Sequence, residues 1–193
     1  MKVRTLAALV APAAFVILSH PSFASASPAP MCMGHRATIV GTAGHDVIHG
    51  TRHADVIVAE RGGDTVYAGR GDDIVCAGGG DDRVHAGRGA DRVSGGAGSD
   101  TLAGGARDDV EFGNSGDDAL SGGTGDDVLS GGYGNDDLQG EDGDDQLDGD
   151  QGDDTLQDDQ GENVEDGDDG NDSCVNTTAT TCDDDQGEDE DAA

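Results

Sequence analysis

An all-β solenoid, built from short strands that stack along one axis, is the fold class that the sequence predicts. A nine-residue period runs from Gly41 to Val175 without an insertion. Repeats of this kind stack as coils, because one unit alone cannot bury its apolar side chain. Within each unit an aliphatic residue stands between two mostly polar neighbours, which is the alternation of a strand with one buried face.

The composition argues against two common classes of protein. The chain has 193 residues, of which 34 are Gly, and its 42 acidic residues against 10 basic ones give a net charge of −32. A nucleic-acid-binding protein needs a basic surface, and a conventional globular enzyme needs more large apolar side chains for its core. Composition alone predicts disorder, whereas the periodic order of the residues predicts a fold.

The first 26 residues have the layout of a secretory signal peptide. Lys2 and Arg4 precede an apolar run over residues 5–18, and Ala24-Ser25-Ala26 offers a cleavage site between small residues. A membrane anchor is the alternative, but the run is shorter than the ~20 residues of a spanning helix. We therefore expect a secreted, extracellular chain that begins near Ser27 and has no membrane span.

The four cysteines fit an exported protein. An oxidising compartment favours disulfides, and four cysteines allow three pairings. Cys174 and Cys182 are close enough for a local loop, which leaves Cys32 with Cys76 and would tie the N-terminal segment to the body. A zinc site is the alternative, and it is less favoured because no CxxC pair is present.

Three columns of the repeat carry its chemistry. Gly fills the fourth position except at His53 and Arg107, and an aliphatic residue fills the eighth except at Glu111, Glu165 and Cys174. The sixth position is Asp in fourteen of the fifteen units, with Asn163 as the exception. The candidate metal ligands are Asp46, Asp55, Asp64, Asp73, Asp82, Asp91, Asp100, Asp109, Asp118, Asp127, Asp136, Asp145 and Asp154.

Each column has a physical meaning. Gly at the first, second and fourth positions predicts a tight turn with positive φ, followed by a strand of about three residues with one side chain inward. Stacked units place the Asp side chains in rows, where carboxylates about 4.8 Å apart repel one another unless a cation lies between them. Hard oxygen ligands select Ca²⁺ or Mg²⁺, and a flexible ring of carboxylates and carbonyls suits Ca²⁺ better. We therefore expect a chain that stays open without metal and folds with it.

The units resemble the nonapeptide G-G-x-G-x-D-x-U-x of the RTX, or hemolysin-type, calcium-binding proteins. The best copies are GGAGSDTLA at 95–103, GGTGDDVLS at 122–130 and GGYGNDDLQ at 131–139. The resemblance implies a right-handed parallel β-roll with two units per coil. It also implies calcium between the turns of units i and i+2, held by the Asp of position six and by turn carbonyls. Fifteen units allow thirteen such pairs.

Two units depart from the pattern. In the unit over residues 104–112, Arg107 replaces a turn Gly and Glu111 takes an inward position, so we expect a bulge or an empty site there, because a buried unpaired carboxylate is costly. In the unit over residues 158–166 the pattern nearly fails, with Asn163 and Glu165.

No catalytic motif occurs in the sequence. HExxH, GxSxG, Walker A and a complete GxGxxG are all missing, so we expect no enzymatic activity. The expected organisation is a signal peptide over 1–26, an N-terminal segment over 27–40, a calcium-binding repeat domain over 41–175 and a disordered acidic tail over 176–193. The expected function is calcium binding by a secreted protein with no nucleic-acid partner. The alternatives are a calcium-ordered adhesion or cell-surface protein with an unidentified partner, and an inactive repeat region left from a toxin or hydrolase.

Overall fold

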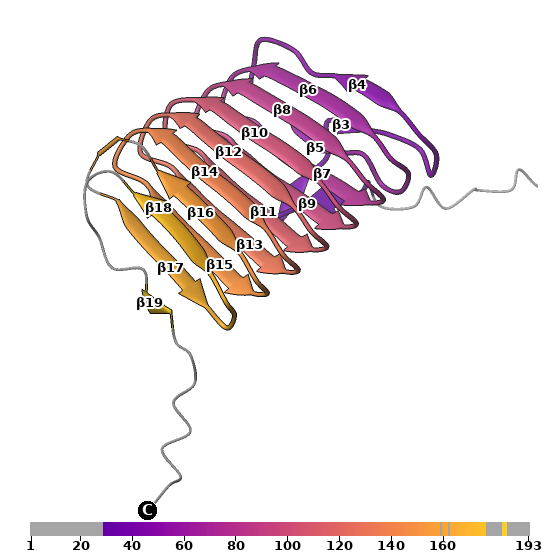
Figure 1. The fold of residues 1–193 in the computed structure, drawn as a ribbon. Helices are drawn as coiled ribbons and strands as arrows, with labels where there is room; N and C mark the ends of the chain where they lie inside the picture. The colour runs from indigo at the N-terminus through magenta and orange to yellow at the C-terminus, as the bar shows by residue number, and fades with distance from the viewer. Residues whose placement is uncertain (1–28, 159, 162, 177–182, 185–193) are drawn as a thin grey trace, which may run out of the picture.

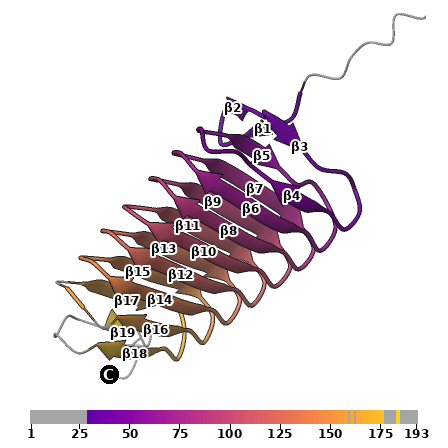
Figure 2. The ribbon, with the colours of Figure 1, turned by 90° about the horizontal axis from the view of Figure 1, so that it is seen from above.

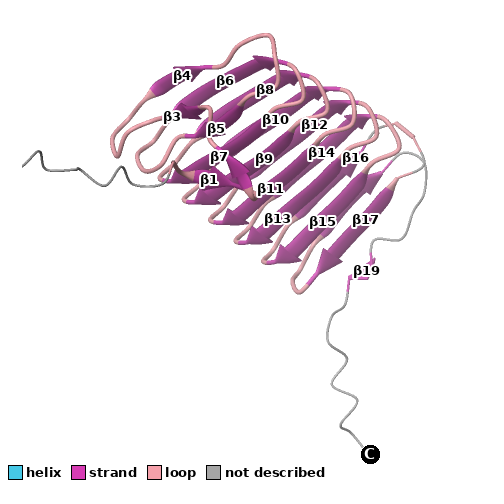
Figure 3. Cartoon of the chain, turned by 180° about the vertical axis from the view of Figure 1, so that it is seen from behind, coloured by secondary structure: helices cyan, strands magenta, loops and turns pink. Residues whose placement is uncertain are grey.

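The computed structural model describes residues 29–158, 160–161, 163–176 and 183–184, and these residues form strands and turns wound into a solenoid of about 8 turns. Figure 1 shows two sheets that face each other along the whole length of the roll, and Figure 3 shows the same layers from behind. The predicted all-β parallel roll is confirmed. The signal peptide expected over 1–26 lies outside the described residues, as does most of the acidic tail. Among the described residues, no helix is long and apolar enough to cross a membrane.

Even-numbered and odd-numbered strands form separate parallel sheets. The first sheet has eight strands, in the order β18-β16-β14-β12-β10-β8-β6-β4. Its members are β4 (Val47–His49), β6 (Thr65–Arg70), β8 (Arg83–Arg88), β10 (Thr101–Ala106), β12 (Ala119–Thr124), β14 (Asp137–Asp142), β16 (Thr155–Asp158) and β18 (Ser173–Asn176). The second sheet has nine, in the order β19-β17-β15-β13-β11-β9-β7-β5-β3. Its members are β3 (Ile39–Val40), β5 (Val56–Val58), β7 (Ile74–Gly79), β9 (Arg92–Ala97), β11 (Val110–Ser115), β13 (Val128–Tyr133), β15 (Gln146–Gln151), β17 (Val164–Asp168) and β19 (Asp183–Asp184).

The pairing register gives the number of units in each coil. Leu102 of β10 pairs with Val84 of β8 on one side and with Leu120 of β12 on the other, and each step is two units of the repeat. Successive units therefore alternate between the two sheets. The expectation of two units per coil is confirmed.

The strands are longer than the sequence predicts. In the middle of the roll each strand has six residues, which occupy positions seven to nine of one unit and one to three of the next. For these strands the expected length of three residues with one inward side chain is wrong, since positions eight and one both point inward, whereas β4 and β5 do have three residues with one buried side chain. Positive φ occurs at positions two and four, as in Gly132 (109°) and Gly134 (134°), but at none of the position-one glycines.

The two inward positions of a strand share the space of the core. Val66, Val75 and Val84, at position eight, are followed two residues later by Ala, whereas Leu102 and Leu129 are followed by Gly. In these strands the longer Leu comes with the smaller neighbour, which limits the change in volume from layer to layer, as close packing requires. The buried aliphatic residues form one continuous cluster from Ile48 to Leu156.

Glu111 keeps the register that the sequence expected it to break. β11 pairs without a bulge, and Glu111 stands opposite Val93 and Leu129. The ladders on both sides hold the strand, so the carboxyl group enters the core and is fully buried. The expected bulge is therefore wrong. Burial raises the pKa of Glu111 well above its ordinary value, and the charges of Asp109 and Asp127 raise it further.

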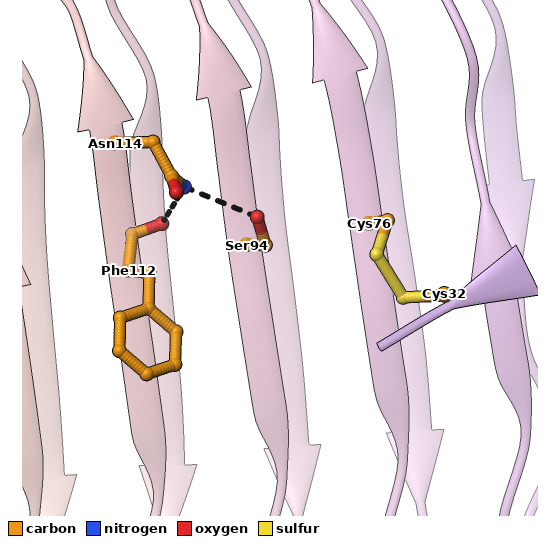
Figure 4. The surroundings of a disulfide bond; sticks show 5 residues. All are labelled: Cys32, Cys76, Ser94, Phe112 and Asn114. Carbon is orange, nitrogen blue, oxygen red and sulfur yellow. Dashed lines mark hydrogen bonds between the residues drawn. A yellow bond between two sulfur atoms is a disulfide. The ribbon is translucent and has the colours of Figure 1, made fainter. Parts of the chain in front are cut away.

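A short hairpin covers the N-terminal end of the roll. β1 (Met31–Cys32) and β2 (His35–Arg36) pair antiparallel, and Figure 2 shows them at the indigo end, beside β5. A disulfide joins Cys32 to Cys76 of β7 (Figure 4), with a Cα–Cα distance of 5.7 Å. Cys174 is also disulfide-bonded, and Cys182, its expected partner, lies outside the described residues.

Candidate metal centre

The Asp residues of position six form two rows inside the roll. Each stands at the end of a turn, directly before a strand, and the strand alternation turns its side chain inward. The row before the eight-stranded sheet contains Asp46, Asp64, Asp82, Asp100, Asp118, Asp136, Asp154 and Asp172. The row before the nine-stranded sheet contains Asp55, Asp73, Asp91, Asp109, Asp127, Asp145 and Asn163.

One oxygen of each carboxylate binds the neighbouring coil. The backbone N–H of Asp100 donates to Oδ1 of Asp118 at 2.7 Å, and that of Asp118 donates to Oδ1 of Asp136 at the same distance. The same bond recurs in both rows between residues 18 apart. Each row is thus a hydrogen-bonded ladder that sets the distance between coils.

The other oxygen has no donor. From Asp64 to Asp154 these carboxylates are at most 3% exposed, and their Oδ2 atoms are buried without a hydrogen-bond donor among the described residues. A buried charged oxygen without a partner costs several kcal/mol, on the order of 2–7 for a polar group. The ladders therefore contain a regular series of oxygen atoms that need a proton or a cation.

The first two predicted ligands differ from the rest. Oδ2 of Asp46 accepts the backbone N–H of Thr42 at 2.6 Å, and Oδ2 of Asp55 accepts that of Thr51 at 2.7 Å. In these units Thr replaces the Gly of position two and its φ is not positive. Of the thirteen predicted ligands, eleven thus present an open buried Oδ2, and Asp46 and Asp55 do not.

The electrostatics of the ladders show the cost of their charge. Burial raises the pKa of Asp100 and Asp109 to about 7, and those of Asp91, Asp118 and Asp127 to about 6. The backbone N–H bond to Oδ1 offsets part of this rise, whereas neighbouring Asp charges add to it. At a row spacing of about 4.8 Å and an effective dielectric constant of 20, two carboxylates repel by about 3 kcal/mol.

Backbone carbonyls of the turns lie close to the next coil. A Cβ added to Gly134 would stand 2.0 Å from the carbonyl oxygen of Gly116, and one added to Gly132 would stand 2.4 Å from that of Asn114. Position two is not restricted to Gly, because Asn114 and Glu141 adopt positive φ there as well. The turns therefore bring carbonyl oxygens of successive coils to the same edge as the carboxylates.

This donor set fits a hard divalent cation. Carboxylate and carbonyl oxygens in a flexible arrangement are the ligands of Ca²⁺, whereas Mg²⁺ requires a smaller and stricter octahedron. The open Oδ2 atoms are the observation in the structure that fits such an ion best. The residues that would hold it are the eleven ladder Asp from Asp64 to Asp154, with the carbonyls of their turns.

Two further groups of acidic residues were not singled out from the sequence. Asp side chains at position five form a second ladder on the surface. Here each Asp accepts a backbone N–H from the following coil rather than from the preceding one, as where Ser99 N–H donates to Oδ1 of Asp81 at 3.1 Å. Asp148, Asp150 and Asp168 bring carboxylate oxygens within 4.8 Å of one another on the outer face of the nine-stranded sheet. Asp148 is at position nine, and Asp150 and Asp168 are at position two, where most other units carry small or neutral residues. The acidic residues in these two columns are the signal in the sequence that could have indicated this second group.

Comparison with known proteins identifies the repeat. A family model described as the RTX calcium-binding nonapeptide repeat (four copies) matches residues 37–66, 49–84, 77–111, 112–147 and 139–174. Together these matches cover most of the chain and nearly all of the roll. No curated protein matches the chain.

Proposed function

This chain belongs to the RTX calcium-binding nonapeptide-repeat family, and we propose that it is a secreted protein whose repeats fold into the roll when calcium binds between the coils. RTX repeats bind calcium, and the ladder of buried aspartates is consistent with that property. The family's repeat roll is a structural calcium-binding domain and is not typically catalytic. The proposed ligands are the eleven ladder residues from Asp64 to Asp154.

The single observation that supports the proposal most is the series of open Oδ2 atoms. Each belongs to a carboxylate whose Oδ1 already holds the neighbouring coil, so the side chain cannot turn away to reach solvent without breaking the ladder. A bound cation supplies the positive charge that these oxygens lack.

In the folded roll, the chain's own residues orient the groups of the site. The backbone N–H of the preceding coil fixes each carboxylate through Oδ1, so that Oδ2 is oriented inward. The glycines of positions two and four let the turns of successive coils approach closely enough to present their carbonyls. The buried aliphatic cluster keeps water from the interior, which strengthens every electrostatic interaction there.

Secretion is the second part of the proposal. It rests on the signal-peptide layout of residues 1–26 and on the disulfide between Cys32 and Cys76, because disulfides persist in oxidising compartments. Millimolar extracellular calcium would then switch the chain from open to folded after export. Mass spectrometry of the N-terminus of the exported chain tests this part, with Ser27 as the expected first residue.

Counting bound ions in two neighbouring variants tests the calcium site. Asp118 is buried in the ladder, whereas Asp117 is exposed, and both accept a backbone N–H through Oδ1. Asp118→Asn removes a ladder charge but can still accept that bond, so we expect calorimetric titration to show a loss of calcium binding. Asp117→Asn makes the same change of charge outside the ladder and is the matched control. Equal titration curves for the two variants would contradict the proposed site.

A further inference from the structure

The unit over residues 158–166 departs from the repeat in two columns at once. Position six is Asn163, which accepts the N–H of Asp145 through Oδ1 at 3.0 Å and donates through Nδ2 to the carbonyl oxygen of Gln160. The ladder of the nine-stranded sheet therefore lacks a carboxylate oxygen at this coil. Position one, which is Gly or Ala in every other unit, is Asp158.

The side chain of Asp158 reaches back over the preceding coil to Asp145. A Cβ added to Gly140 would stand 2.4 Å from Oδ2 of Asp158 and 2.6 Å from Oδ2 of Asp145. The two oxygens thus occupy one small space, which exists because Gly140 has no side chain. Asp158 lies at the end of β16, and Asp145 lies in the turn before β15, in the orange part of the roll (Figure 1).

Both carboxyl groups are isolated from solvent. Asp145 is 1% exposed and Asp158 is fully buried. Each uses Oδ1 for a backbone N–H, that of Asp127 at 2.7 Å and that of Gln160 at 3.3 Å respectively. Apart from each other, their Oδ2 atoms have no hydrogen-bond partner among the described residues.

The electrostatics support the need for a positive charge here. Burial raises the pKa of Asp158 to about 7, and the charges of Asp145 and Glu165 raise it further. Glu165 takes an inward position on β17 and is 1% exposed. Three acidic groups thus face one buried region in which the ladder itself has lost a carboxylate.

We propose that Asp158 and Asp145 together hold a calcium ion above Gly140, at a place where the nine-residue period assigns no pair of carboxylates. Asp158 supplies, from position one, the acidic oxygen that Asn163 lacks at position six. The proposal rests on the proposed calcium function and adds to it one site that is specific to this chain.

Ion counting on the full chain tests the proposal, with Ca²⁺ as the only added metal. Equilibrium dialysis with atomic absorption gives the number of ions bound to the unaltered chain. Asp158→Asn is expected to bind one ion fewer, as is Gly140→Ala, whose Cβ fills the space between the two oxygens. Asp137→Asn is the matched control, because Asp137 is exposed on the adjacent strand β14 and the change of charge is the same. It is expected to bind as many ions as the unaltered chain.

A double variant shows whether the two departures compensate each other. Asp158→Gly with Asn163→Asp restores the repeat at both positions, so it is expected to recover the lost ion. If Asp158→Asn binds as many ions as the unaltered chain with unchanged affinities, the proposal is overturned. If Asp158→Asn fails to fold, the double variant provides the test instead. A double variant that binds one ion fewer than the unaltered chain would contradict the proposal that Asp158 replaces the carboxylate missing at position 163. Failure of the proposed calcium function would give a different result from failure of this one site, because the unaltered chain would then bind no calcium at all.

Discussion

Replacing Glu111 with Leu should stabilise the folded roll. Glu111 occupies a position-eight site that aliphatic residues fill in the neighbouring strands, and it is fully buried between Val93 and Leu129. Within the part of the chain that the structure describes, neither of its carboxylate oxygens has a hydrogen-bond partner, although the backbone N–H of Ser121 approaches the group. The core therefore contains an acid at a place where an apolar side chain fits.

The expected gain has two sources. Burying a Leu side chain contributes about 2 kcal/mol, and removing a buried unpartnered polar group contributes about 1–3 kcal/mol. Protonation of Glu111 already removes part of the cost of burying it in the unaltered chain. We therefore expect Glu111→Leu to raise the free energy of unfolding by about 2–4 kcal/mol. The gain should rise from pH 5 to pH 8, because the raised pKa of Glu111 makes its burial more costly as the pH rises.

Urea unfolding in saturating Ca²⁺, followed by circular dichroism, measures this gain. Glu111→Gln is the control, because it keeps the size of the side chain but leaves a buried unpartnered amide, so a much smaller gain is expected. A decrease in the stability of Glu111→Leu would refute the reasoning. If that decrease came with the loss of a bound ion, Glu111 would be a ligand rather than a misplaced core residue.

Three further predictions concern the ladders, the turns and the disulfide. In chelator, a larger fraction of the chain should be folded at pH 5 than at pH 8. Burial raises the pKa of Asp100 and Asp109 from 3.8 to about 7, so burying these carboxyl groups costs more as the pH rises through this window. Circular dichroism from pH 5 to pH 8 with EDTA tests this, and a larger folded fraction at pH 8 would contradict it. Gly132→Ala should cost roughly 1–3 kcal/mol, because φ is 109° and the new Cβ would lie 2.4 Å from a carbonyl oxygen. Gly44→Ala, where the nearest atom is 3.9 Å away, should change the unfolding free energy by less than about 0.5 kcal/mol in the same urea titration. Replacing Cys32 and Cys76 with Ser should lower the stability in Ca²⁺ by about 4 kcal/mol, from the loop of 44 residues that the bond closes; equal unfolding midpoints would show that the bond adds nothing.

The repeat determines much of the fold at the level of the sequence. The spacing of Asp100, Asp109 and Asp118 predicts rows of carboxylates, and the aliphatic column predicts the inward face, because both follow from a strict period. The strand length predicted from the sequence is too short, and the reason is the glycine at position one. The sequence predicts Gly at position one, as in Gly131, to be a turn residue, whereas in the structure it is a small inward residue that leaves room for the Asp of the same unit.

The departures from the repeat were harder to interpret from the sequence. The sequence predicts a bulge or an empty site at Glu111, but β11 has no bulge, because the hydrogen bonds to two flanking strands outweigh the cost of one buried acid. The contact between Asp158 and Asp145 could not be found by inspecting columns, because it joins position one of one coil to position six of the coil before it. Such neighbours become visible only when the coils are stacked.

Solution scattering of the chain at neutral pH, first in EDTA and then in millimolar Ca²⁺, tests the central claim most directly. The account predicts an expanded chain in EDTA, with a radius of gyration approaching the ~45 Å of an unfolded chain of this length, and a much smaller elongated particle in Ca²⁺. Equally compact particles in both solutions would show that the rows of buried carboxylates do not need a metal ion to stay folded.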